Sequence, residues 1–213
     1  MPASGITSLT YQEVDKGAAF LRDALAEFQA RDIGALWCGL SCSRMLERTM
    51  RKLDEIAARV AARLIERGET IAVSESSAGG LIAAALLAIP GASSYFLGGA
   101  VVYTATAREA LLGITRDDMA GMRSASEAYA ALLARTLRER FGASWTLAET
   151  GAAGPTGNRY GDAAGHACFA ISGPSEAVRT LETGSTDRAA NMRAFAVAAL
   201  ALLEDALGPA LNA

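Results

Sequence analysis

The sequence predicts an α/β fold, a three-layer α/β/α sandwich around a mixed, largely parallel central sheet. Short apolar segments without charge alternate with longer segments whose apolar residues recur at helical spacing. This alternation is typical of strands that are buried between two layers of helices. The composition, 51% hydrophobic and 20% charged over 213 residues, provides for a sizeable core and excludes global disorder.

A helix over residues 46–67 begins the regular part of the chain. Its apolar residues Leu53, Ile56 and Val60 recur every three or four positions, so they form one stripe, and Gly68 ends the helix. The opposite face is rich in Arg and Glu, as expected for a helix that covers a sheet.

The later elements are predicted from apolar runs and from the residues that separate them. Pro90-Gly91 stops one helix, Ser124 or Ser126 caps another, and Ser172-Gly173-Pro174 turns one strand back toward its neighbour. The predicted elements are strand 70–75, helix 78–89, strand 99–103, helices 106–112 and 126–140, strands 144–150, 165–171 and 177–183, and helix 188–207. The final strand pair supplies the antiparallel part of the sheet.

Residues 1–44 follow a different pattern. Residues 11–30 are amphipathic, and the Gly-, Ser- and Cys-rich segment after them has no clear period. Two explanations fit this change: an accessory helix that packs on the domain or on a partner, or a start-site artefact with the true start at Met45 or Met50. The domain itself is expected over residues 45–213.

Charge and cysteine content exclude several classes of function. Lys+Arg number 20 against Asp+Glu 23, a net charge of −3, and basic and aromatic residues do not interleave, so nucleic-acid binding is not expected. Cys38, Cys42, Cys168 and the single His166 are too scattered for a structural zinc site, and we expect no metal. Without an apolar run of about 18 residues or a signal-peptide pattern, we expect no membrane contact and a cytoplasmic location.

A Gly-rich turn follows the first predicted strand, with the sequence Glu75-Ser76-Ser77-Ala78-Gly79-Gly80. Ser76 lies where the strand leads into the next helix, whose N-terminal N–H groups and positive dipole favour an anion or an oxyanion. The alternative is that Ser76 or Ser77 is only the N-cap and that the glycines permit close packing.

A second Gly-rich segment, Thr150-Gly151-Ala152-Ala153-Gly154-Pro155-Thr156-Gly157-Asn158, follows the strand over 144–150. Its backbone amides can face a ligand, and the loop is long for a plain connection between two strands. A structural turn is the alternative, but the length favours ligand binding.

These turns and the segment between them resemble motifs of the CinA C-terminal domain family, the nicotinamide-nucleotide amidases. Residues 75–80 resemble its Glu-Ser-Cys-Thr-Gly-Gly motif, and residues 150–155 its Thr-Gly-Ile-Ala-Gly-Pro loop. Residues 90–103 resemble its Pro-Gly-Ser-Ser…Phe…Gly-Gly…Tyr run, and Asp187-Arg188 its Gly-Asp-Arg entry to the last helix. The resemblance runs in order from about residue 50 to residue 205.

The resemblance implies a hydrolase that converts nicotinamide mononucleotide to nicotinic acid mononucleotide and ammonia, without a cofactor. Ser76 would attack the carboxamide carbon, and the amides near Ala78, Gly79 and Gly80 would stabilise the tetrahedral oxyanion. Glu75, in the same motif, is expected at the ligand site.

The resemblance also implies how the nucleotide is held. The second loop would bind part of it, through Thr150, Gly151, Gly154, Pro155 and Gly157. Arg188 would pair with its phosphate, which suits a bidentate guanidinium; the alternative is a solvated arginine at a helix N-terminus. Alanine-rich faces on the terminal helices lead us to expect a homo-oligomer.

The sequence departs from the family where a lysine is expected. The family has Tyr-Ser-Asn-x-Ala-Lys where this chain has Tyr103-Thr104-Ala105-Thr106-Ala107-Arg108, and its only lysines are Lys16 and Lys52. Arg108 does not lose its proton at accessible pH, so it can orient a ligand or stabilise an anion but cannot act as a base. Tyr103, Glu75 and His166 are the alternative bases. The alternative prediction is therefore a catalytically impaired family member that acts as a nucleotide-binding or regulatory module.

Overall fold

The computed structural model describes the backbone of residues 35–209 and the side chains of residues 49–209. The chain divides into two units, Met1–Met45 and Leu46–Ala213, and the fold described is that of the second. The helix predicted over 11–30 and the thiols of Cys38 and Cys42 lie outside the described residues. The two explanations of residues 1–44 stay predictions.

The elements of the described chain follow the predicted order. They are α2 (Ala35–Arg67), β1 (Ile71–Glu75), α3 (Leu81–Leu87), the 3₁₀ helix η1 (Ala92–Ser94), β2 (Phe96–Val101), α4 (Ala105–Leu112), α5 (Glu127–Phe141), β3 (Trp145–Ala152), β4 (His166–Ser172), β5 (Ala177–Glu182) and α6 (Arg188–Leu207). Ser126 caps α5 by accepting from the amide of Tyr129, as one of the two predicted caps.

Three boundaries differ from the predictions by three residues or more. The helix expected from residue 46 begins at Ala35, and the strand expected at 99–103 lies at Phe96–Val101. The helix expected from residue 78 begins only at Leu81, because Gly80 has a φ of 100° and interrupts the helical backbone. The polar contacts that stabilise this irregular turn form part of the site.

The five strands form one mixed sheet in the order β2-β1-β3-β4-β5. β1 pairs parallel with both β2 and β3, whereas β3–β4 and β4–β5 are antiparallel. Every residue of β1 and β4 is buried, and the edge strands β2 and β5 are partly exposed. The α/β fold class and its mixed sheet are therefore confirmed.

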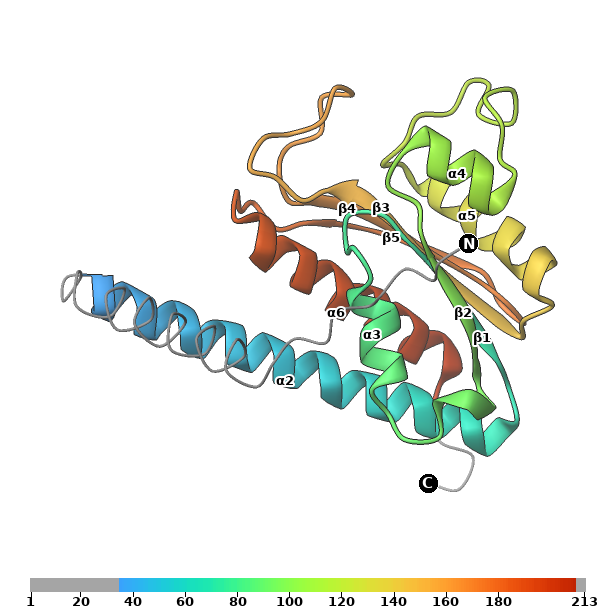
Figure 1. Cartoon of the computed structure of the whole chain (residues 1–213), viewed down its shortest axis with the longest axis horizontal. Coiled ribbons are helices and arrows are strands. Elements are labelled where there is room, and N and C mark those ends of the chain that lie inside the picture. Colours follow the sequence, from blue (N-terminus) through green and yellow to red (C-terminus); the bar gives the residue numbers. More distant parts are fainter. Residues whose placement is uncertain (1–34, 210–213) are drawn as a thin grey trace, which may run out of the picture. The chain divides into compact units, whose positions relative to one another are not determined.

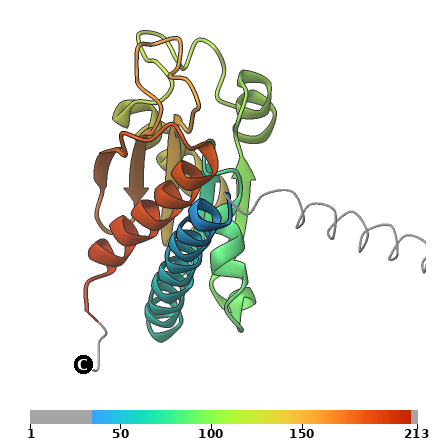
Figure 2. The same cartoon turned by 90° about the vertical axis from the view of Figure 1, so that its left-hand side faces the viewer.

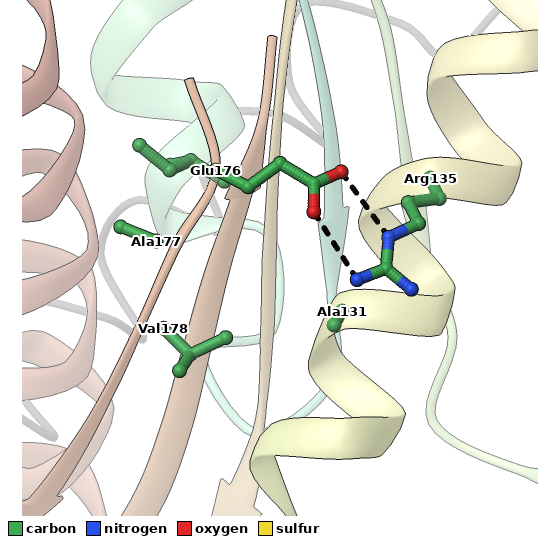
Figure 3. Close-up of a pocket in the computed structure, with 6 residues that line it drawn as sticks. Ala131, Arg135, Glu176, Ala177 and Val178 are labelled. Atoms are coloured by element: carbon green, nitrogen blue, oxygen red, sulfur yellow. Dashed lines mark hydrogen bonds and ion pairs between the residues drawn. The ribbon is translucent and has the colours of Figure 1, made fainter.

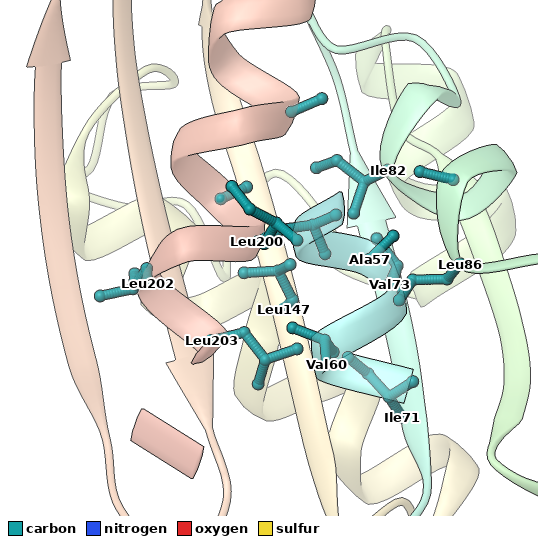
Figure 4. Close-up of a cluster of buried hydrophobic side chains, with 14 of the residues drawn as sticks. Ala57, Val60, Ile71, Val73, Ile82, Leu86, Leu147, Leu200, Leu202 and Leu203 are labelled. Carbon is teal, nitrogen blue, oxygen red and sulfur yellow. The ribbon is translucent and has the colours of Figure 1, made fainter. Parts of the chain in front are cut away.

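Helices cover both faces of this sheet (Figures 1 and 2). On one face, α3, α6 and the C-terminal part of α2 enclose the larger core, in which Leu200 and Leu203 of α6 meet Leu147 of β3 and Val60 of α2 (Figure 4). On the other face, a smaller core joins α4 and α5 to the sheet, with Leu133 fully buried at its centre.

The sheet topology determines where the loops gather. Because β1, β2 and β3 are mutually parallel, their carboxyl ends lie at one edge of the sheet. The turn 76–80, the segment 102–104 and the long loop 153–165 all leave the sheet at that edge. Ligands of open α/β sheets bind at such an edge, so the two Gly-rich segments have the position that a shared site requires.

Candidate functional site

The turn after β1 is built around the carboxylate of Glu75. The Glu75 side chain is 1% exposed and accepts hydrogen bonds from the amides of Gly80, Ile82 and Ala83, at 2.9, 3.0 and 2.8 Å. Burial raises the pKa of this carboxyl, and the three hydrogen bonds oppose the shift. Glu75 thus satisfies the amides that begin α3.

A second buried carboxylate, Glu149 of β3, holds the same turn from the neighbouring strand. It accepts from the amides of Ser76 and Ala78, at 2.9 and 2.8 Å, and from the hydroxyl of Ser77. Glu149 is fully buried, which raises its pKa against the effect of these hydrogen bonds. The sequence analysis missed Glu149. The signal that could have found it is an acidic residue near the end of an otherwise apolar strand.

These contacts decide which groups of the turn remain available. The amides of Ala78 and Gly80, expected near the oxyanion, donate instead to Glu149 and Glu75. In the described part of the chain, the amides of Ser77 and Gly79 have no hydrogen-bond acceptor.

A cleft with two lobes lies beside this turn. The larger lobe has a volume of about 560 Å³ and the smaller about 270 Å³, and Tyr103, Gly151 and Asn158 line both. Ser76 faces the larger lobe and Ser77 the smaller. The two Gly-rich segments of the sequence therefore meet at one cavity.

The cleft brings together many of the predicted site residues. The larger lobe is lined by Ser76, Tyr103, Arg108, Thr150 and Gly151, and the smaller by Tyr103, Gly151, Gly154, Gly157 and Arg188. The linings of the two lobes do not include Glu75, Ala78, Gly79, Gly80 or Pro155. Glu75, Ala78 and Gly80 contribute contacts that fix the turn.

Two arginines of the cleft, one in each lobe, are anchored by backbone carbonyls. Nε of Arg108 donates to Ile114 O at 3.1 Å, and the side chain is buried. Arg188 is exposed; it donates to Gly154 O at 2.8 Å and to the hydroxyl of Tyr103 at 3.2 Å. Arg188 therefore ties the second loop to the segment after β2.

The loop 153–165 is held in shape by its own polar residues. The Asn158 side chain donates to Asp162 at 2.8 Å and accepts from the amides of Tyr160 and Asp162, and Arg123 forms an ion pair with Asp162. Gly157 passes so close to Asp162 O that a Cβ would lie 2.1 Å from it, so only glycine fits there. The loop is a built structure that presents Tyr160 to the larger lobe.

His166 lies at the start of β4 and does not line the cleft. Its Nδ1 is hydrogen-bonded to Glu182, and its Nε2 lies 3.0 Å from Ala125 O. Burial lowers its pKa, but the contacts with Glu182 and Ala125 and the charge of Asp162 outweigh burial and raise it overall. Of the three alternative bases, Tyr103 is the one that lines the cleft, whereas Glu75 and His166 are engaged elsewhere.

Another cavity of about 230 Å³ lies between α5 and the β4–β5 hairpin, with the ion pair of Arg135 and Glu176 at its lining (Figure 3). The charges of Arg135 and Glu176 neutralise each other in this cavity.

Among residues 49–209, no cluster of three or more His, Cys, Asp or Glu side chains could hold a metal ion. None of the described helices has the length and apolar character needed to cross a membrane.

Comparison with known proteins identifies the family. The sequence profile of the CinA C-terminal domain matches residues 53–207, a segment that extends from α2 through α6. The chain belongs to the CinA C-terminal domain family. Its CinA-type segment is 40% identical over 144 residues to a CinA-like protein of Anaeromyxobacter sp. (strain K), covering 67% of this chain and 35% of that protein. A CinA-like protein of Gloeobacter violaceus is 39% identical over 58% of this chain and 29% of its own length.

Solved CinA structures share the fold. The competence/damage inducible protein CihA of Agrobacterium tumefaciens matches with a TM-score of 0.69 and 28% identity, over 74% of this chain and 96% of that one. A CinA superfamily protein of Klebsiella pneumoniae matches with a TM-score of 0.68 and 28% identity, over 73% and 97%. The chain thus corresponds to nearly all of these solved CinA chains, but to about a third of the CinA-like relatives matched by sequence.

Proposed function

We propose that this CinA-family protein is an amidohydrolase that hydrolyses the carboxamide of nicotinamide mononucleotide to nicotinic acid mononucleotide and ammonia. One observation carries the proposal: Ser76 and Arg188 line the two lobes of a single cleft that share Tyr103 and Gly151. A ligand with an amide at one end and a phosphate at the other would match this arrangement.

The nucleophile would be Ser76. Its amide is fixed by Glu149, and the residue lines the larger lobe. The Ser76 oxygen would bond to the carboxamide carbon while its proton passes to the hydroxyl oxygen of Tyr103, whose own proton moves to the departing nitrogen, which leaves as ammonia. Water would then cleave the acyl-serine to release the carboxylate and regenerate the hydroxyl.

The developing negative charge would be stabilised at two places. The amide of Ser77, the residue that follows Ser76, has no acceptor in the described part of the chain and would be the N–H donor of the turn. Arg108 contributes a permanent positive charge in the same lobe. Preorganised donors of this kind are usually the largest contribution to acyl-transfer catalysis.

The phosphate would bind in the smaller lobe. Arg188 lies there beside Gly154 and Gly157, and its guanidinium is already oriented by Gly154 O. An arginine fork suits phosphate oxygens, and a glycine-lined wall lets the ligand approach the backbone closely.

A second function, a nucleotide-binding or regulatory module without turnover, is favoured by Arg108. It occupies the position of the family lysine in the alignment of motifs and cannot accept a proton. Such a module would bind pyridine nucleotides in the same cleft, with no release of ammonia.

The test is ammonia release from nicotinamide mononucleotide by the purified full chain. We expect turnover by the wild type and a loss of about a thousandfold or more in Ser76→Ala, because the nucleophile is removed. Ser93→Ala, which changes an exposed serine in η1, should retain the wild-type rate. Binding without ammonia at high enzyme concentration would establish the module instead, and an active Ser76→Ala variant would refute the serine mechanism.

A further inference from the structure

Arg108 is the basic side chain that the fold buries. Within residues 49–209 it is 9% exposed, and every other arginine there, and Lys52, is at least partly exposed. Its guanidinium donates to two neutral carbonyl oxygens, Ile114 O at 3.1 Å and Thr115 O at 3.5 Å. Among the described residues, no carboxylate lies within ion-pair distance of it, and the charge of Asp118 acts on it only from farther away.

A buried charge without a counter-charge is unfavourable, and proteins ordinarily pair such groups. Even exposed arginines of this chain are paired: Arg123 with Asp162, and Arg135 with Glu176 (Figure 3). Arg108 differs because the space beside it is the larger lobe of the cleft. A close ion-pair partner for it can therefore come from a ligand.

The lining of the cleft has one sign of charge. Arg108 and Arg159 line the larger lobe and Arg188 the smaller, and the linings contain no aspartate or glutamate. The nearby carboxylates of Glu75 and Glu149 are buried under the turn on backbone amides. Although the chain carries a net charge of −3, this cleft favours a ligand with more than one negative group.

Tyr129 of α5 adds a second donor next to Arg108. Tyr129 is 4% exposed, and it lines the same lobe. Burial raises the pKa of its phenol against the effect of the neighbouring Arg108 guanidinium, so the hydroxyl keeps its proton for donation. A guanidinium and a phenol side by side match the two oxygens of a carboxylate.

We propose that Arg108 and Tyr129 form a carboxylate subsite, so that the cleft binds pyridine nucleotides with a ring carboxylate more tightly than those with a carboxamide. The carboxylate supplies the counter-charge of Arg108 while the phosphate is held at Arg188. This inference rests on the proposed function, which puts the pyridine ring in the larger lobe and the phosphate in the smaller.

Calorimetry on the full chain tests the preference. In Ser76→Ala, which removes turnover from the measurement, nicotinic acid mononucleotide should bind about tenfold or more tightly than nicotinamide mononucleotide. Arg108→Met, which keeps the length without the charge, should abolish the difference, and Tyr129→Phe should reduce it. Arg193→Met, which removes an arginine of α6 that contacts Ala189 O and lines neither lobe, should preserve it.

The failure of this inference is distinguishable from failure of the amidase. Equal affinities for the two nucleotides, or a preference that survives in folded Arg108→Met and in Tyr129→Phe, overturn the carboxylate subsite whatever the rate of ammonia release. If the wild type releases no ammonia but still binds nicotinic acid mononucleotide more tightly than nicotinamide mononucleotide, the carboxylate subsite is supported and the proposed amidase activity is refuted. Circular dichroism of each variant establishes that it is folded.

Discussion

The amide of Ser76 donates to the carboxylate of Glu149 at 2.9 Å, across 73 positions of the chain. The serine that we propose as nucleophile is therefore positioned by the strand beside its own, and it lines the cleft. Glu149 also binds the Ser77 hydroxyl and the Ala78 amide, so one buried carboxylate fixes three consecutive residues of the turn.

Glu149→Gln should lower the free energy of unfolding by about 1–3 kcal/mol, because an amide offers one acceptor oxygen to three donors that are buried or half-buried. Urea denaturation measures this loss. Glu176→Gln makes the same change at an exposed ion pair and should cost less than about 1 kcal/mol. Equal losses in the two variants would contradict the structural role of Glu149.

Arg108→Lys should raise the rate of ammonia release from nicotinamide mononucleotide by about tenfold or more, because a lysine can give up its proton and act as a base. Steady-state kinetics with coupled ammonia detection measures it. The matched control is Arg159→Lys, which changes an exposed arginine of the same lobe and should bring no gain. A slower Arg108→Lys enzyme would mean that the arginine itself is required.

Arg188→Gln should reduce kcat/KM for nicotinamide mononucleotide by about ten- to a hundredfold, the equivalent of one charge-assisted phosphate contact. The rate with nicotinamide riboside, which lacks the phosphate, should change much less. Arg193→Gln alters another arginine of α6, one that contacts Ala189 O outside the cleft, and should affect neither substrate. Equal effects on nucleotide and nucleoside would show that Arg188 acts through Tyr103 instead.

His166 should make stability depend on pH. Its pKa in the folded state is raised above the ordinary value of 6.5, so the protonated ring stabilises the fold fully below pH 6.5. That contribution is lost as the pH rises through the raised folded pKa. Urea denaturation of wild type and His166→Gln should therefore show a difference that narrows on the alkaline side, and parallel curves would refute the shift.

The local pattern of the sequence was enough to predict most of the fold. Apolar runs and turn residues predicted β1, β3, the β4–β5 hairpin and α6 within two residues of their observed ends. One boundary that moved has a tertiary cause: α3 begins late because Glu75 and Glu149 hold the residues before it in a non-helical turn. Helical periodicity does not report such contacts.

The site was predictable only in part. Motif spacing selected Ser76, Gly154 and Arg188, and the structure places all three at one cleft. Glu149 and Tyr129 were missed because their neighbours in sequence are ordinary strand and helix residues. Glu149 reaches the turn because β3 pairs with β1. Tyr129 comes close to Arg108 because it lies on the face of α5 that packs against α4.

The sequence by itself determined the alternation of strands and helices, the two Gly-rich segments at the ends of strands, and the arginine where the family has lysine. Only the tertiary structure decided which donors of the turn are already engaged, and that Arg108 is buried beside the cleft with no carboxylate of the described residues within ion-pair distance. The physical reason is that periodicity and turn chemistry act between near neighbours in the chain. Burial and ion pairing depend on groups that approach only when the sheet is assembled.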